Sequence, residues 1–173
     1  MNDNLARVIG ISGPAGSGKS TAADLLIERH GYVRVKFAAP LKAMCRAIGM
    51  TDDQIEGSLK ETPSRLLQGR TPRYVMQTLG TEWGRKLVGE NLWIDLWTES
   101  VNACLDQGGR VVCDDVRFAN EALAVLKLGG IVYRLQGRGG ISGAHDSERG
   151  DFFAHRLIGN DGSRDELYNR LVA

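Results

Sequence analysis

RVIGISGPAGSGKSTAADLLIERH, residues 7–30, holds the strongest structural signal in this chain. The apolar run Arg7–Ser12 predicts a buried strand. The turn after it, Gly13–Ser20, has the pattern G-x-x-x-x-G-K-S, and the stretch Lys19–His30 predicts a helix that ends at Gly31 as its C-cap. A strand, a Gly-rich turn and a helix in this order are typical of a loop that binds phosphate groups.

Each part of this turn has a chemical purpose. Glycines let the backbone wrap a phosphate without Cβ clashes, and the start of the following helix adds positive potential. Lys19 is expected to reach the β- and γ-phosphates, and Ser20 to hold Mg²⁺. The predicted nucleotide contacts of this turn are Gly13, Ala15, Gly16, Ser17, Gly18, Lys19, Ser20 and Thr21. The alternative is an ordinary Gly-rich turn, which the flanking strand and helix argue against, so we expect an ATP-type ligand with Mg²⁺.

Outward from the loop, short apolar runs alternate with helical stretches, which indicates an α/β fold with a parallel sheet. The further expected strands are Tyr32–Phe37, Arg110–Asp114, Ile131–Leu135 and His155–Ile158. The further expected helices are Leu41–Ile48, Pro72–Val88, Leu92–Leu105, Asn120–Leu128 and Arg164–Leu171. Residues Thr51–Arg70 are polar and weakly patterned, so they are expected to form an irregular insertion. The length of 173 residues fits one domain, 1–173.

Composition excludes several classes of protein. The formal net charge of +1 gives no general basic field for nucleic acid. The three cysteines lack metal or disulfide spacing, the first residues lack a signal-peptide pattern, and no apolar stretch is long enough for a membrane. We therefore expect a cytoplasmic protein with no nucleic-acid or membrane partner. A GTPase would carry an N-K-x-D motif, which this sequence does not contain.

Two adjacent carboxylates, Asp114 and Asp115, end the third expected strand. The carboxyl edge of a parallel sheet is where ligands bind, and a carboxylate there can reach Mg²⁺. Because strand residues alternate in direction, one of the two is expected to serve the metal, and Asp115 is favoured. The alternative is that both cap the helix near Phe118. Arg117, two residues later, is a candidate to bridge two phosphate groups.

The expected helix Pro72–Val88 carries two stripes at 100° per residue. One stripe is apolar and predicts core contacts; its members are Met76, Leu79, Trp83 and Leu87. The neighbouring stripe, Arg73, Gln77, Gly80 and Gly84, is typical of a polar pocket floor, or alternatively of a solvated edge whose glycines allow close packing. Arg85 falls about 120° from Arg73 and joins this stripe only if the helix breaks at Gly84.

Between Gly137 and Gly150 the chain is rich in Gly, Arg and Ser. Phosphoryl transfer must exclude water, and a closing lid that carries an Arg does so while neutralising charge. Arg134 and Arg138, at the base of this loop, are the expected lid arginines. The alternative is a flexible loop without a function.

Taken together, the motifs resemble the phage-type deoxynucleoside monophosphate kinases of the P-loop nucleoside monophosphate kinase superfamily. The resemblance covers nearly the whole chain. It depends on GPAGSGKST (Gly13–Thr21), FAAPLK (Phe37–Lys42), TPRYVMQTLGTEWGR (Thr71–Arg85), DDVRFANE (Asp114–Glu121), HDSE (His145–Glu148) and NDGS (Asn160–Ser163). Asp114 departs from the family pattern, which also favours Asp115 as the metal ligand.

This resemblance implies a five-stranded parallel sheet flanked by helices, an acceptor-binding insertion at about 38–90 and a lid at about 137–152. It implies transfer of the γ-phosphate of ATP, with Mg²⁺, to a dNMP in the cytoplasm (of the host, for a phage gene). The implied catalytic residues are Lys19, Arg117 and Arg138. The implied acceptor-binding residues are Lys42, Arg73, Gln77, Arg85, Arg117 and Asn120. Asn160 and Asp161 would lie near the adenine, although NDG also fits a simple turn.

Several readings stay open from the sequence. Phosphomevalonate kinase shares the P-loop, the PLK segment and a D-x-R after a strand, and dephospho-CoA kinase is a looser relative. A non-catalytic ATP-binding module is the alternative of another class. The accepted bases and the preference between ribose and deoxyribose are not determined by sequence. Either a monomer or a homodimer is expected, and the candidate dimer interface is the expected helix Leu92–Leu105.

Overall fold

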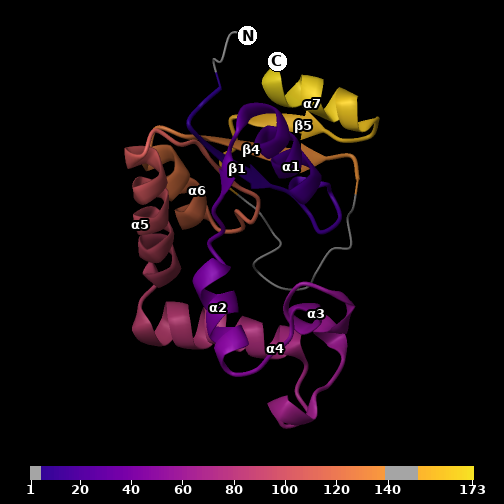
Figure 1. Cartoon of the computed structure of the whole chain (residues 1–173), viewed down its shortest axis with the longest axis vertical. Helices are drawn as coiled ribbons and strands as arrows, with labels where there is room; N and C mark the ends of the chain where they lie inside the picture. The colour runs from indigo at the N-terminus through magenta and orange to yellow at the C-terminus, as the bar shows by residue number, and fades with distance from the viewer. Residues whose placement is uncertain (1–4, 139–151) are drawn as a thin grey trace. The chain divides into compact units, whose positions relative to one another are not determined.

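The computed structural model describes residues 5–138 and 152–173 (Figure 1). Five strands form one sheet in the order β2-β3-β1-β4-β5, and every neighbouring pair is parallel. The strands are β1 (Val8–Ser12), β2 (Val33–Arg34), β3 (Val111–Cys113), β4 (Ile131–Gln136) and β5 (Arg156–Gly159). The prediction of an α/β fold with a five-stranded parallel sheet is confirmed.

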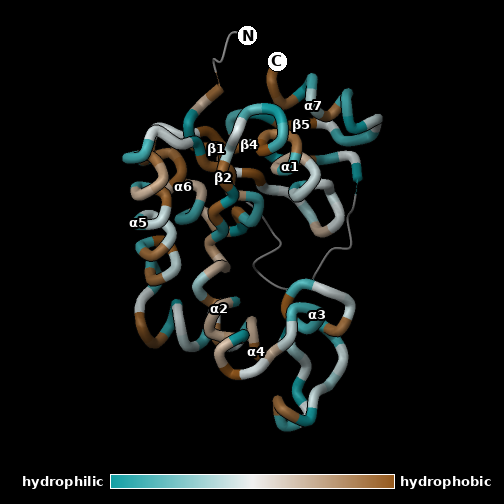
Figure 2. Tube along the Cα trace, viewed as in Figure 1, coloured by the Kyte–Doolittle hydropathy of each residue, from teal (hydrophilic) through white to brown (hydrophobic). Residues whose placement is uncertain are grey.

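Strand β1 lies at the centre of the sheet and is buried along its whole length. Its neighbours are in register, with Gly10 opposite Cys113 of β3 and Ser12 opposite Arg134 of β4. A strand buried on both faces is a continuous apolar run, as Val8–Ile11 is. In Figure 2 the hydrophobic colour accordingly gathers on the strands. The ends of β1, β3 and β4 thus meet at one edge of the sheet, where the Gly-rich loop begins.

Helices cover both faces of the sheet. On one face, α1 (Lys19–His30) and α7 (Arg164–Val172) pack against the strands through a buried apolar cluster that includes Ile11, Leu26, Leu135 and Leu167. On the other face lies α6 (Ala119–Lys127), close enough that a Cβ at Gly10 would stand 3.1 Å from Val125. The sheet is therefore enclosed in the way that parallel sheets require.

The chain divides into two compact units. Unit 1 comprises residues 1–37 and 97–173 and contains the sheet; unit 2 comprises residues 38–96. Helix α5 (Leu92–Asp106) begins in unit 2 and continues into unit 1. The sequence predicted one domain with an insertion near 38–90, and the boundaries of unit 2 lie close to that range.

Unit 2 has its own small core, formed by Leu41, Cys45, Met50, Ile55, Leu67 and Trp93. Its elements are α2 (Ala39–Ala47), α3 (Asp52–Ile55), the 3₁₀ turns η1 (Ser58–Glu61) and η2 (Arg65–Leu67), α4 (Pro72–Gln77) and the π-helix η3 (Thr78–Val88). The prediction that Thr51–Arg70 is irregular was wrong in part. Thr51 caps α3 through a reciprocal capping box with Gln54, which gives a short helix to a stretch with little apolar periodicity.

The expected uniform α-helix over Pro72–Val88 was also wrong, because its second half is π-helical. The amide of Gly89 donates to the carbonyl of Gly84 at 2.9 Å, which is the i→i−5 bond of a π-helix. The wider winding rotates side chains away from the positions that 100° per residue gives. Leu87 is 78% exposed, so its predicted core contact is wrong. Met76 and Leu79 do pack against the core of unit 2, and Trp83, although 38% exposed, lies with its ring 6.2 Å from that of Trp93.

Strand β2 is much shorter than the predicted Tyr32–Phe37: it lies at the edge of the sheet and pairs there with β3, which is itself only three residues long. The predicted lid, about 137–152, lies almost entirely outside the described residues. No helix in the described part of the chain is long and apolar enough to cross a membrane.

Candidate active site

The Gly-rich loop leaves the carboxyl end of β1 and enters α1. Gly13, Gly16 and Gly18 have φ values of 139°, 74° and 94°, a region that side-chain-bearing residues rarely adopt. A Cβ at Gly13 would stand 2.7 Å from the carbonyl oxygen of Leu135, and one at Gly18 would collide with the side-chain amide of Asn160. The loop conformation therefore requires glycine at these positions.

Helix α1 presents its first amides at this loop. Gly18 precedes it and has no side chain to cap them, and the first turn carries no acidic residue. Lys19 and Ser20 are the first two residues of the helix, and the Lys19 ammonium donates to the carbonyls of Gly13 and Pro14 at 2.7 and 2.8 Å. Uncapped amides and a nearby ammonium favour an anion at this helix end.

Ser17 lies inside the loop and is fully buried. In the part of the chain that the structure describes, its Oγ has no hydrogen-bond partner. A buried hydroxyl without a partner is costly and marks a place where a bound group is expected to complete the hydrogen bonding. The loop therefore has a composition and geometry that fit a bound phosphate group. The individual contacts expected from Gly13, Ala15, Gly16, Ser17, Gly18, Lys19, Ser20 and Thr21 stay a prediction.

Asn160, from the turn between β5 and α7, holds the loop from the other side. Its side-chain amide donates to the Ser17 carbonyl at 2.8 Å, its backbone amide donates to Gln136, and the residue is 5% exposed. The sequence placed Asn160 near the adenine. In the structure its side chain is bonded to the loop backbone, so it acts as a brace of the phosphate loop.

The other residues of this region lie around the same turn. Asp161 is exposed and pairs with Arg170, whose guanidinium lowers the pKa of the Asp161 carboxyl. Arg138 donates to the carbonyl of Gly162 at 2.7 Å, so the base of the predicted lid reaches this turn. Arg134 donates to the carbonyl of Phe152 at 3.2 Å and lies 5.1 Å from its ring, which ties it to the start of the segment before β5.

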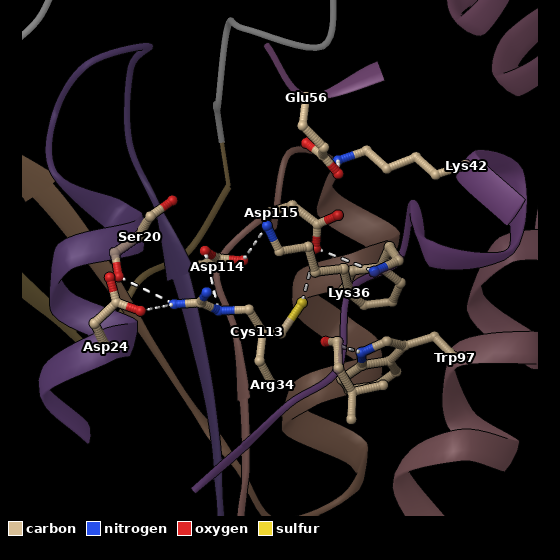
Figure 3. A network of polar contacts seen from close by, with 12 residues as sticks. Ser20, Asp24, Arg34, Lys36, Lys42, Glu56, Trp97, Cys113, Asp114 and Asp115 are labelled. Carbon is tan, nitrogen blue, oxygen red and sulfur yellow. Dashed lines mark hydrogen bonds and ion pairs between the residues drawn. The ribbon is translucent and has the colours of Figure 1, made fainter. Parts of the chain in front are cut away.

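The two carboxylates after β3 have different surroundings (Figure 3). Asp115 accepts the backbone N–H of Phe37 at 3.0 Å and the thiol of Cys113 at 3.1 Å on the same oxygen. Burial, followed by the charge of Asp115, raises the pKa of the Cys113 thiol well above its usual value. Asp114 is 3% exposed and lies 3.3 Å from Lys36 and 3.5 Å from Arg34.

Sequence reasoning missed Arg34 and Lys36. They are two residues apart at the end of β2, and alternation along an extended chain places such residues on one face. Two cations separated by one valine in VRVKF are unusual for a buried strand, and this was the signal that could have identified them.

The alternative role considered for the two aspartates was to cap α6. The capping carboxylate that the structure shows is that of Glu121, which is 3% exposed and accepts the backbone amides of Arg117 and Phe118 at 2.7 and 3.1 Å. The backbone of Arg117 is thereby fixed two residues before the helix, while its side chain is exposed, and Asn120 lies half-buried in the first turn.

Among the described residues, no group of three or more His, Cys, Asp or Glu is arranged to hold a metal ion. Mg²⁺ is commonly bound by one or two protein oxygens together with phosphate oxygens and water. The hydroxyl of Ser20 and the carboxylates after β3 supply that kind of ligand.

The remaining predicted acceptor-binding residues belong to unit 2. Lys42 pairs with Glu56 at 2.6 Å, and Arg73 pairs with Glu61. Arg85 donates to the backbone carbonyl of Glu90 at 3.3 Å, and Gln77 is half-buried. The structure therefore gathers the predicted nucleotide contacts in unit 1 and most of the predicted acceptor contacts in unit 2.

The π-helix changes the relation between Arg73 and Arg85. A π-helix turns by roughly 80° per residue, so from Gln77 onward Arg85 comes to within about 40° of Arg73. The sequence had required a helix break at Gly84 for this. Gly80 and Gly84 rotate away instead, and added Cβ atoms there would stand 2.9 Å from Leu41 and 2.5 Å from the ring of Trp93. Their role is close packing, the alternative that the sequence left open.

The sheet order, the glycine loop and the helix that receives it define the class of protein: a P-loop kinase fold. A comparison with models of known families gave no match. The chain is 34% identical over 189 aligned positions, covering 96% of this chain and 94% of the relative, to a protein of Acanthamoeba polyphaga mimivirus named "Putative deoxynucleotide monophosphate kinase". The chain belongs to this deoxynucleotide monophosphate kinase family.

Among solved structures, the chain is similar to the crystal structure of TT1252 from Thermus thermophilus. The two are 18% identical, the match covers 98% of this chain and 96% of that one, and the TM-score is 0.49. So distant a likeness has no bearing on function.

Proposed function

We propose that this protein is a nucleotide kinase that transfers the γ-phosphate of ATP to a deoxynucleoside monophosphate, giving ADP and a deoxynucleoside diphosphate. The observation that carries the proposal is the phosphate loop: its glycines are held in left-handed conformations, Asn160 braces it, and α1 directs uncapped amides and Lys19 at its centre. Membership in a family whose relative is named a kinase of this kind supports the choice of acceptor.

Transfer is expected to proceed in line, without a covalent enzyme intermediate. A phosphate oxygen of the acceptor attacks the γ-phosphorus while the bond to the β–γ bridging oxygen breaks, and ADP leaves. The protein then contributes positioning and charge stabilisation. Loop amides and Lys19 hold the donor phosphates, and Arg117 and Arg138 neutralise charge on the transferred group.

Mg²⁺ fits this site, because Ser20 lies at the start of α1 and two carboxylates follow β3. Ser20 and an aspartate at the end of β3 would hold the ion. When bound, the ion would neutralise negative charge on the phosphate oxygens. On the acceptor side, Lys42, Arg73 and Arg85 would bind phosphate and Gln77 and Asn120 would bind polar groups of the nucleotide. In unit 2 the carboxylates of Glu56 and Glu61 already pair with Lys42 and Arg73, so an incoming phosphate would compete with them.

The test is an acceptor panel with ATP and Mg²⁺, followed by chromatography of the products. It contains the four common dNMPs, the matching NMPs, phosphomevalonate and dephospho-CoA. We expect ADP and a dNDP in equal amounts with at least one dNMP. Turnover of phosphomevalonate or dephospho-CoA alone would replace this proposal with another small-acceptor kinase, and ATP binding without turnover of any acceptor would indicate a non-catalytic module.

Two variants accompany the panel. Lys19→Ala should lower turnover by at least about a hundredfold because it removes a cation from the transferred phosphate. Lys86→Ala is the matched control, since Lys86 is exposed and pairs with Glu82 one helical turn away. Equal activity of both variants would contradict the role of the loop.

A further inference from the structure

We propose that Arg34 is a positioning residue for the metal side of the phosphate loop, and that it acts through the buried carboxylate of Asp114. The inference depends on the proposed function, because it takes Ser20 as a ligand of nucleotide-bound Mg²⁺. It assigns to Arg34, Lys36 and Asp114 a role in setting how well that ion is held.

Arg34 joins three elements of unit 1 (Figure 3). From the end of β2, its Nη2 donates to the backbone carbonyl of Ser20 at 3.1 Å and to the Asp24 carboxylate at 2.8 Å, both on α1. Its Nε lies 3.5 Å from Oδ2 of Asp114, directly after β3. One planar guanidinium thus links the first turn of α1 to the carboxyl edge of the sheet.

Asp114 is an unusual carboxylate. Its side chain is 1% exposed, and among the described residues neither of its oxygens has a hydrogen-bond partner. Lys36 at 3.3 Å and Arg34 at 3.5 Å supply charge at distances longer than good hydrogen bonds. Two cations flank the carboxylate, while its lone pairs retain the capacity to accept from another donor or to face a further cation.

A buried ion pair of this kind is weak evidence for a role in stability. Buried ion pairs can often be replaced by apolar residues of similar volume with no loss of stability, because burying the charges is expensive. Asp115 differs, since one of its oxygens already accepts two hydrogen bonds that fix Phe37 and Cys113. We therefore infer that Asp115 holds Phe37 and Cys113 in place, whereas Asp114 supplies the negative charge on the side of the loop where the metal ion binds.

The consequence for Ser20 is direct. Arg34 holds the Ser20 carbonyl while it pairs with Asp114, so the guanidinium sets the position of the Ser20 residue relative to this carboxylate. Partners that orient metal ligands typically change metal affinity or activity by about 10- to 100-fold when removed.

The experiment measures Mn²⁺, as a paramagnetic substitute for Mg²⁺, by electron paramagnetic resonance of the full-length protein with ATP. Arg34→Gln and Arg34→Lys should each weaken Mn²⁺ binding about tenfold or more. Calorimetry should show little change in the affinity for metal-free ATP. Asp24→Asn is the matched control: it removes one partner of Arg34 but leaves its links to Ser20 and Asp114, so Mn²⁺ binding should be retained.

A purely structural role is distinguished by Arg34→Met, Lys36→Met and Asp114→Leu made together. We expect the apolar triple variant to keep its Tm while Mn²⁺ binding stays weak. Mn²⁺ affinity at the wild-type level, in this variant or in Arg34→Gln, would overturn the inference. If the triple variant does not fold, Arg34→Lys provides the test instead, because it keeps the positive charge and removes only the planar, forked guanidinium group. A wild-type protein that binds no ATP would refute the proposed function instead.

Discussion

The side-chain amide of Asn160 donates a 2.8 Å hydrogen bond to the backbone carbonyl of Ser17, a residue 143 positions earlier in the chain. Through this contact, the turn between β5 and α7 fixes the conformation of the phosphate loop, although the two segments lie far apart in the sequence. It also explains Gly18, where a Cβ would collide with that same amide.

Removing this brace should weaken both folding and ATP binding. Asn160→Ala leaves the Ser17 carbonyl without its partner in a buried site, which costs about 1–3 kcal/mol. We expect a lower free energy of unfolding by urea and a raised KM for ATP, with a smaller change in the KM of the acceptor. A variant with normal ATP affinity would show that the loop keeps its shape without Asn160.

Arg73 should act on the acceptor and not on ATP. Arg73→Ala is expected to raise the KM of the dNMP by about tenfold or more, because an arginine–phosphate contact contributes at least about 1.5 kcal/mol. Arg46→Ala is the control, since Arg46 also lies in unit 2 and pairs with a carboxylate, Asp52. Steady-state kinetics with each substrate varied in turn would check this; equal increases in both KM values would remove Arg73 from the acceptor site.

Gly84 should be intolerant of a side chain. A Cβ there would stand 2.5 Å from the ring of Trp93, whose indole N–H donates to the Gly80 carbonyl at 2.8 Å. Gly84→Ala should therefore destabilise the protein by about 1–3 kcal/mol. Gly89→Ala is the matched control, because Gly89 has φ of 167° and open space around it. Thermal unfolding of both variants checks the contact, and equal Tm values would contradict it.

The buried Cys113 thiol should make stability fall at alkaline pH. Burial raises its pKa in the folded state, so on unfolding the thiol releases a proton once the pH exceeds the unfolded value of about 8.5. Its contribution is fully present below that pH and is lost as pH rises above it. Between pH 8 and pH 10, the free energy of unfolding of Cys113→Ala should decline less steeply than that of the wild-type protein, as measured by urea titrations at each pH. Parallel pH profiles for the two proteins would contradict this.

Much of unit 1 could be predicted from local sequence because its signals are local. The loop Gly13–Ser20 is flanked by a buried strand and a helix that ends at Gly31, and both ends of α1 indeed carry left-handed glycines. The carboxyl edge of the parallel sheet then locates Asp114 and Asp115. These features depend on periodicity and backbone conformation, which a single sequence displays.

The rest depends on partners distant in the chain. The π-winding of η3 cannot be read from a 100° wheel, and it is associated with the packing of Gly80 and Gly84 against Leu41 and Trp93. The pairing of Asp114 with Arg34 and Lys36 requires that β2 and β3 be neighbours in the sheet. Their register, in which Val33 lies opposite Val111, cannot be read from the local sequence of either strand. The hydrogen bond between Asn160 and Ser17 cannot be predicted from local sequence either, because the two residues lie 143 positions apart in the chain.

The stacked rings of Phe37 and Trp97, 4.3 Å between centroids, mark where the chain leaves unit 1 and where it returns. Trp97 also donates to the Val35 carbonyl, and Asp115 holds the Phe37 amide, so departure and return are fastened together inside the sheet-bearing unit. A segment whose two ends are already joined in this way can be lengthened, shortened or exchanged during evolution with little entropic penalty to its host. Changes in the length or sequence of unit 2 would thus leave the sheet and the phosphate loop of unit 1 intact.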